Sequence, residues 1–223
     1  EILKAKCEDF HMKFSEKLFE RFLKFHSKHQ FYRVFEMKNS SLGPLAAASV
    51  AEIALSYQNI RIISLAGNCI RNGGAACFAE LLVRPNNIIA LDLSLNSTTG
   101  DGLAAIFNAV SKNKTLVSLS IGSTGGAGGN SMDSVAAKEF ARMLSQNKVL
   151  SELDIPMCEI NSDTMDMISV GLSLNTTLSS LNLAGNNLQT KGAIKFLSSL
   201  SSNGIRELNL SGNHLTDGIG PAL

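Results

Sequence analysis

The sequence is poor in the residues that most often build catalytic and metal-binding sites. Its 223 residues include no Trp, two Tyr and four His. No His or Cys residues are paired at the spacing of a zinc site, and no Ser/His/Asp or Cys/His set can be assembled around His214. We therefore predict no catalytic residues, no metal site and no cofactor.

Cysteines and long apolar runs are also scarce. The four cysteines, at positions 7, 69, 77 and 158, are too few and too scattered for a disulfide framework. No run of about 18 apolar residues indicates a transmembrane helix, and residues 1–30 lack the apolar region of a signal peptide. These absences predict an intracellular, cytoplasmic protein for which membrane contact is not expected.

An excess of charge of either sign is absent as well. The chain has 20 Lys and Arg against 19 Asp and Glu, which gives a formal net charge of +1. The basic stripe that nucleic-acid-binding proteins present is missing from most of the chain. A nucleic-acid partner is therefore not expected.

The sequence does contain a recurring motif. Residues 178–188 read Leu-Ser-Ser-Leu-Asn-Leu-Ala-Gly-Asn-Asn-Leu, in which Leu181 and Leu183 alternate with polar residues as in a strand with one buried face. The pattern starts seven times, at intervals of 28, 28, 28, 34, 28 and 27 residues, at Tyr32, Ile60, Ile88, Leu116, Leu150, Leu178 and Ile205. Recurrence at a nearly fixed period indicates a repeat protein.

Each repeat has a small residue capable of hydrogen bonding where the chain leaves the strand. An Asn at this position can satisfy backbone groups that would otherwise be buried without partners. We predict a structural ladder of stacked side chains formed by Ser40, Asn68, Asn96, Thr124, Cys158, Asn186 and Asn213.

Helical segments are predicted between the strands, where apolar residues recur three and four positions apart. They span 45–55, 74–82, 102–111, 134–145, 162–174 and 191–200. The period of 28 with a full helix, and the motifs at 181–186 and 208–213, resemble leucine-rich repeats of the ribonuclease-inhibitor class. That class also occurs in the Ran GTPase-activating protein and in NOD-like receptors.

The resemblance implies an α/β fold: a curved right-handed solenoid with parallel strands on the concave face and helices on the convex face. Residues 31–223 would form an array of about seven repeats. The last repeat is incomplete, so we expect a part of a longer chain.

Residues 2–29 are predicted to form one amphipathic helix. Phe10, Phe14 and Phe22 fall on an aromatic stripe, and a basic stripe with Lys13 and Lys17 lies beside it. We interpret residues 1–30 as an N-terminal cap that covers the open edge of the first repeat. The alternative is a helix that binds a partner groove or an acidic membrane surface.

The fourth repeat is longer than the others because of a glycine-rich segment, residues 122–133. It lacks the Gly-Lys-Ser/Thr sequence of a phosphate-binding loop. We predict a flexible loop after the strand and a contact with a partner there.

The concave strand face is the usual contact surface of such a solenoid. Here its side chains are small and polar with an acidic tendency, and the middle of the face lacks Trp, Tyr and Arg. We predict a non-catalytic scaffold that binds a protein partner, and the acidic residues favour a basic one. The candidate contact residues are Arg61, Asp92, Glu152, Asp154, Asn182, Glu207 and Asn209.

A GTPase activator is the alternative that the resemblance to the Ran GTPase-activating protein implies. That protein uses the rim of the same scaffold. In this sequence Arg71, which follows Ile70, is the residue that could approach a GTPase.

Overall fold

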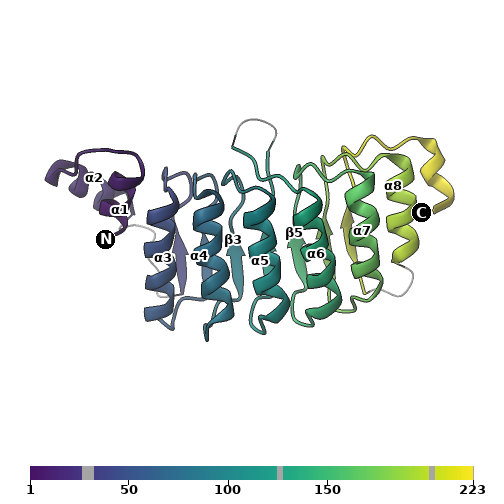
Figure 1. The fold of residues 1–223 in the computed structure, drawn as a ribbon, viewed down its shortest axis with the longest axis horizontal. Coiled ribbons are helices and arrows are strands. Elements are labelled where there is room, and N and C mark those ends of the chain that lie inside the picture. The colour runs from purple at the N-terminus through teal and green to yellow at the C-terminus, as the bar shows by residue number, and fades with distance from the viewer. Residues whose placement is uncertain (27–32, 125–127, 201–203, 223) are drawn as a thin grey trace.

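The computed structural model describes residues 1–26, 33–124, 128–200 and 204–222, which form one open sheet covered by a layer of helices (Figure 1). Seven parallel strands lie in sequence order, each paired with the next. Every strand begins two residues after a predicted repeat start: β1 (Val34–Glu36), β2 (Ile62–Ser64), β3 (Ala90–Asp92), β4 (Ser118–Ser120), β5 (Glu152–Asp154), β6 (Ser180–Asn182) and β7 (Glu207–Asn209). The predicted repeat array is therefore confirmed.

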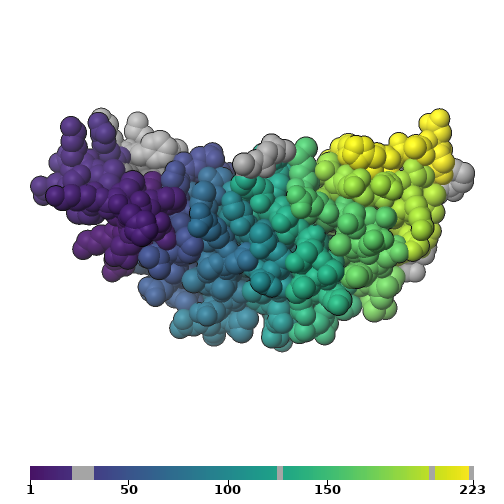
Figure 2. Space-filling model, turned by 45° about the horizontal axis from the view of Figure 1, so that its top comes forward, coloured from purple at the N-terminus to yellow at the C-terminus, as the bar shows by residue number. Residues whose placement is uncertain are grey.

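A helix follows each of the first six strands and packs against the helix of the next repeat. These helices are α3 (Pro44–Ser56), α4 (Arg71–Val83), α5 (Gly100–Lys112), α6 (Ser134–Gln146), α7 (Ser162–Ser173) and α8 (Gln189–Ser199), and their ends lie within three residues of the predicted ones. After β7 the chain forms the 3-10 helix η1 (Asp217–Ala222). Neighbouring repeats are stacked side by side along one axis. Figure 2 shows that the stack is shaped like a crescent.

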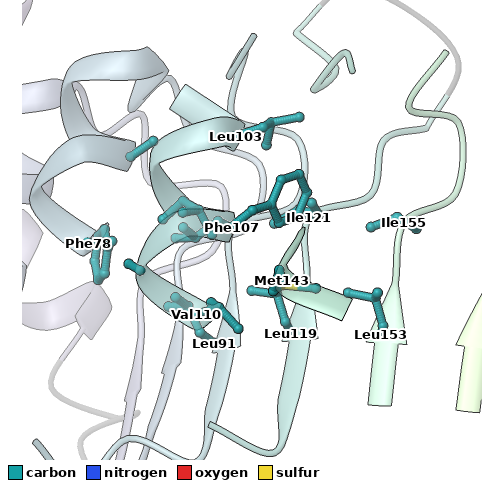
Figure 3. Packing of buried hydrophobic residues seen from close by; sticks show 14 of the residues in the cluster. Phe78, Leu91, Leu103, Phe107, Val110, Leu119, Ile121, Met143, Leu153 and Ile155 are labelled. Carbon is teal, nitrogen blue, oxygen red and sulfur yellow. The ribbon is translucent and has the colours of Figure 1, made fainter. Parts of the chain in front are cut away.

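The core lies between the sheet and the helices. The central residue of each strand faces inward, and Ile63, Leu91 and Leu119 are at most 2% exposed. Figure 3 shows the α5 residue Phe107 among the strand side chains, and its ring centroid lies 4.8 Å from that of Phe140 in α6. Because each repeat buries its apolar face mainly against its neighbours, this packing fixes where the outward strand residues lie.

The prediction of a single helix over residues 2–29 is wrong. The structure has α1 (Ile2–Asp9) and α2 (Glu16–His26) with a break between them. The break is a Schellman turn: His11 adopts a left-handed backbone (φ 52°), its N–H donates to the Glu8 carbonyl, and the Met12 N–H donates to the Cys7 carbonyl at 2.8 Å. Residues 27–32, the end of the predicted helix, lie outside the described part.

The first of these helices, α1, packs against α3 (Figure 1). The predicted aromatic stripe does not form this contact. Leu3 and Cys7 are buried there, and the Asp9 carboxylate accepts hydrogen bonds from the first N–H groups of α3. By contrast, Phe10, Phe14 and Phe19 are 38%, 43% and 41% exposed, while the Phe22 side chain lies outside the described part. The capping role of residues 1–30 stays a prediction.

Candidate partner-binding surface

The asparagine ladder connects the turns that follow the strands. Asn68 Oδ1 accepts hydrogen bonds from the N–H groups of Ser40 (3.0 Å) and Leu42 (2.9 Å) in the preceding repeat. Its Nδ2 group donates to the carbonyls of Met37 and Leu65. Corresponding bonds are formed by Asn96, Asn186 and Asn213. Because these bonds cross from one repeat to the next, they hold neighbouring turns in register.

Two ladder positions carry smaller side chains. The Ser40 hydroxyl donates only to the nearby Lys38 carbonyl, at 3.1 Å. The Cys158 thiol donates to the Ile121 carbonyl at 3.3 Å. Burial raises the pKa of this thiol to about 12, so Cys158 is a protonated hydrogen-bond donor.

Thr124, predicted as the fourth member of the ladder, does not belong to it. Thr124 is exposed, whereas Asn130 is buried and accepts hydrogen bonds from the N–H groups of Asn96 (3.1 Å) and Thr98 (2.9 Å). The extra residues of the fourth repeat precede the ladder asparagine, which displaces it along the sequence. The spacing could have shown this, because Asn130 and Met132 repeat the spacing of Asn96 and Thr98. Residues 125–127 of the glycine-rich segment lie outside the described part.

The outward strand residues form two rows on the concave face. Strand pairing places Asp92 beside Ser64 and Ser120, and it places Asp154 beside Ser120 and Asn182. The second row carries Glu152 beside Ser180, which in turn lies beside Glu207. Of the predicted contact residues, the structure thus places Asp92, Asp154, Asn182, Glu152, Glu207 and Asn209 on one continuous surface.

Hydrogen bonds hold the two aspartates of this surface in place. Asp92 Oδ2 accepts from the Ser64 hydroxyl at 2.7 Å. Asp154 Oδ2 accepts from the Ser120 hydroxyl at 3.0 Å, and its Oδ1 accepts from Asn182 Nδ2 at 2.6 Å. Every donor in these bonds is neutral, so the bonds orient both carboxylates and supply no counter-charge.

Cations lie mainly at the ends of the concave face. Lys38 pairs with Glu36 at 2.9 Å, and this hydrogen bond raises the pKa of Lys38 despite the opposing effect of partial burial. Arg61 immediately precedes β2, is exposed, and forms no ion pair within the described residues. At the other end, Arg206 and Glu207 line a shallow hollow with Asn182 and Asn209.

Arg71, the residue of the GTPase-activator alternative, lies at the start of α4 in a left-handed conformation (φ 55°). Its side chain is exposed at the edge where the strands end, beside Asn72 and Ser97. Among the described residues no group of three or more His, Cys, Asp and Glu could hold a metal ion. The helices of the described residues are all too short or too polar to cross a membrane.

Comparisons with known proteins agree with this architecture. A family model described as "Leucine Rich repeat" matches residues 58–79, 174–197 and 201–223. A search of curated proteins found no match. The structure is similar to leiomodin-1 actin-binding site 2, with a TM-score of 0.53 and 23% identity over 70% of this chain and 87% of that one.

A second similar structure is the tropomodulin C-terminal domain of Caenorhabditis elegans. Its TM-score is 0.53, and the identity is 16% over 68% of this chain and 89% of that one. Likenesses at this level of identity concern the fold alone. Together with the seven strands and the ladder, they show that the chain has the leucine-rich-repeat fold.

Proposed function

We propose that this protein is a non-catalytic module that binds a basic protein partner through its concave strand face. The observation that carries the proposal is the pair Asp92 and Asp154, two carboxylates that are held by neutral donors and form no ion pair in the described residues. A Lys or Arg of a partner would supply the missing counter-charge.

The spacing of the two carboxylates supports a more specific proposal about the partner. Asp92 and Asp154 lie on β3 and β5, two strands apart, which corresponds to roughly 10 Å at the usual strand spacing. Because the carboxylates are already oriented, binding of a cation costs little free energy for ordering these two side chains. The partner should present two basic side chains about 10 Å apart, and binding should weaken with added salt.

Actin is titrated for comparison, because one of the similar structures is the actin-binding site 2 of leiomodin-1. An intracellular setting fits such a partner and the four cysteines, all of which are free thiols in the structure.

The experiment compares the unmodified chain with the variant Asp92→Lys/Asp154→Lys. Partners captured from an extract of the source cell are identified, purified and titrated, and actin is titrated in parallel. The matched control is Glu52→Lys/Glu80→Lys, which makes the same charge change at exposed positions of α3 and α4. We expect at least tenfold weaker binding by the concave variant and no change in the control. Equal binding by all three proteins would refute the proposal.

A second candidate surface is the N-terminal segment. Phe10, Phe14 and Phe19 are exposed, and the basic residues Lys13 and Lys17 lie between them. Such a surface suits a partner groove or an acidic membrane. Phe14→Ser/Phe19→Ser tests it, because these exposed residues lie outside α1 and its contact with α3. Binding that depends on this surface should be lost while the concave face stays intact.

A further inference from the structure

A cleft lies at the edge of the sheet where strands β4 to β7 end. It has a volume of about 640 Å³, and the turns of four consecutive repeats line it. Its lining includes Thr124, Ser131, Met157, Glu159, Asn187 and His214, and we call it the rim cleft.

The described residues on either side of 125–127 in the glycine-rich segment form one wall of the rim cleft. Gly128 and Gly129 line the cleft together with Ser123 and Thr124 on the other arm of the loop. The stem of the loop is held by the Ser123 hydroxyl, which donates to the Asn130 carbonyl at 2.9 Å. The regular repeats lack these extra residues, so the wall belongs to the fourth repeat.

The cleft also contains an apolar surface. Met157 is 43% exposed, and its backbone is left-handed (φ 52°). Its side chain lies across the turn of the next repeat, since a Cβ atom on Gly185 would come within 2.6 Å of Met157 Cγ. An exposed methionine of this kind is suited to contact an apolar side chain, because the thioether adapts to different shapes.

The charge of the cleft favours a cation. Glu159 is exposed and forms no ion pair in the described part of the chain. The adjoining strands add Glu152, Asp154 and Glu207, against Arg206 and His214. An anion such as a phosphate would be repelled, whereas a Lys or Arg side chain would be attracted.

The dimensions fit an extended peptide. Four turns at the usual strand spacing extend over roughly 14 Å, about the length of four residues of extended chain. The exposed amide of Asn187 can both donate to and accept from a peptide backbone. We infer that the rim cleft binds an extended segment of the basic partner, with a Lys or Arg at Glu159 and a neighbouring apolar side chain on Met157. This inference rests on the proposed function and adds a second contact to it.

The test uses a phage-displayed library of random twelve-residue peptides, selected on the full chain. The enriched peptides are synthesised and titrated by fluorescence anisotropy. We expect them to carry a Lys or Arg beside an apolar residue. Glu159→Lys, and a variant without residues 124–129, should each weaken their binding at least tenfold, while Glu80→Lys should leave it unchanged. Circular dichroism establishes that each variant is folded.

The outcomes separate this inference from the proposed function. Selection of no peptide, or of peptides without a cation, overturns the inference, and so does equal binding by Glu159→Lys. If the purified partner binds Glu159→Lys normally but loses affinity for Asp92→Lys/Asp154→Lys, the rim cleft is not a contact and the concave face still is. If neither variant changes partner binding, both ideas fail.

Discussion

The Ser123 hydroxyl closes the stem of the glycine-rich loop by bonding to both backbone groups of Asn130. It accepts from the Asn130 N–H at 2.5 Å and donates to the Asn130 carbonyl at 2.9 Å. The six residues between them, 124–129, are therefore an addition to a regular turn, and the ladder continues through Asn130.

We predict that the loop can be removed without loss of the fold. Deletion of 124–129 with Ser123→Gly restores the 28-residue period and creates the Gly-Asn sequence found at Gly185 and Asn186. Glycine suits the position because Gly185 there has a left-handed backbone (φ 66°). The midpoint of thermal unfolding should stay within a few degrees. Deletion of 124–130, which also removes the ladder asparagine, should lower it clearly; equal effects of the two deletions would contradict the register.

We predict that replacing Thr98 by valine stabilises the protein. Thr98 is 2% exposed, its Oγ1 atom has no hydrogen-bond partner among the described residues, and equivalent positions carry Ile70, Ile160 and Leu188. Thr98→Val removes a buried unsatisfied group without changing the shape, so urea unfolding should show a gain of about 1–2 kcal/mol. The neighbouring Thr99→Val loses a hydrogen bond to Asn72 and serves as the control that should not stabilise. A loss of stability in Thr98→Val would show that its hydroxyl is satisfied.

The ladder itself can be tested at Asn186. Its Oδ1 accepts from the N–H groups of Cys158 (2.9 Å) and Ile160 (3.1 Å), and Asn186 is 2% exposed. Asn186→Ala leaves buried backbone groups unpaired and should cost about 1–3 kcal/mol in the free energy of unfolding. The adjacent exposed Asn187→Ala should be nearly neutral. A neutral Asn186→Ala would mean that the bonds between repeats do not stabilise the array.

We predict that Asp9 stabilises the first repeat through its hydrogen bonds to α3. Gly43, at the N-cap of α3, has no side chain to cap the helix, and the Asp9 carboxylate accepts instead from the N–H groups of Leu45 (2.9 Å) and Ala46 (3.0 Å). Asp9→Ala should cost about 0.5–2 kcal/mol, as for loss of an ordinary cap. Hydrogen exchange should accelerate first in α1 and α3. Glu8→Ala, at an exposed position, is the control. If the backbone amides of α1 and α3 were equally protected from exchange in both variants, Asp9 would not cap α3.

The raised pKa of Cys158 predicts low thiol reactivity and a pH effect. With a folded-state pKa of about 12 the thiol stays protonated near pH 8, so Cys158 should react with a disulfide reagent only on unfolding. An unfolded thiol ionises near pH 8.5. The unfolded state therefore binds fewer protons between pH 8.5 and about 12, and stability should decrease as the pH rises through that range. Cys158→Ala should reduce this decrease, and rapid labelling of the native protein would contradict the assignment.

Much of the concave surface could be predicted because a strand alternates its side chains between two faces. Once the period was known, alternation around Leu91 and Leu153 placed Asp92 and Asp154 on the outward side. Their hydrogen bonds to Ser64 and Ser120 were not predictable, since they join residues of different repeats whose rotamers depend on packing. The rim cleft was missed for a similar reason, because its lining comes from four separate turns.

The repeat could be predicted from the amino-acid sequence, since the strand, turn and helix of each unit follow from local periodicity and from contacts with adjacent units that repeat the same pattern. Two details were established by the folded chain instead. The end of α1 at His11 depends on a left-handed residue that is not glycine, with Asp9 bonded to another helix. The fourth ladder position depends on which residue reaches the preceding repeat, and Asn130 does so, not Thr124. In both places a hydrogen bond to a segment distant in sequence takes part, from Ala46 to Asp9 and from Asn96 to Asn130.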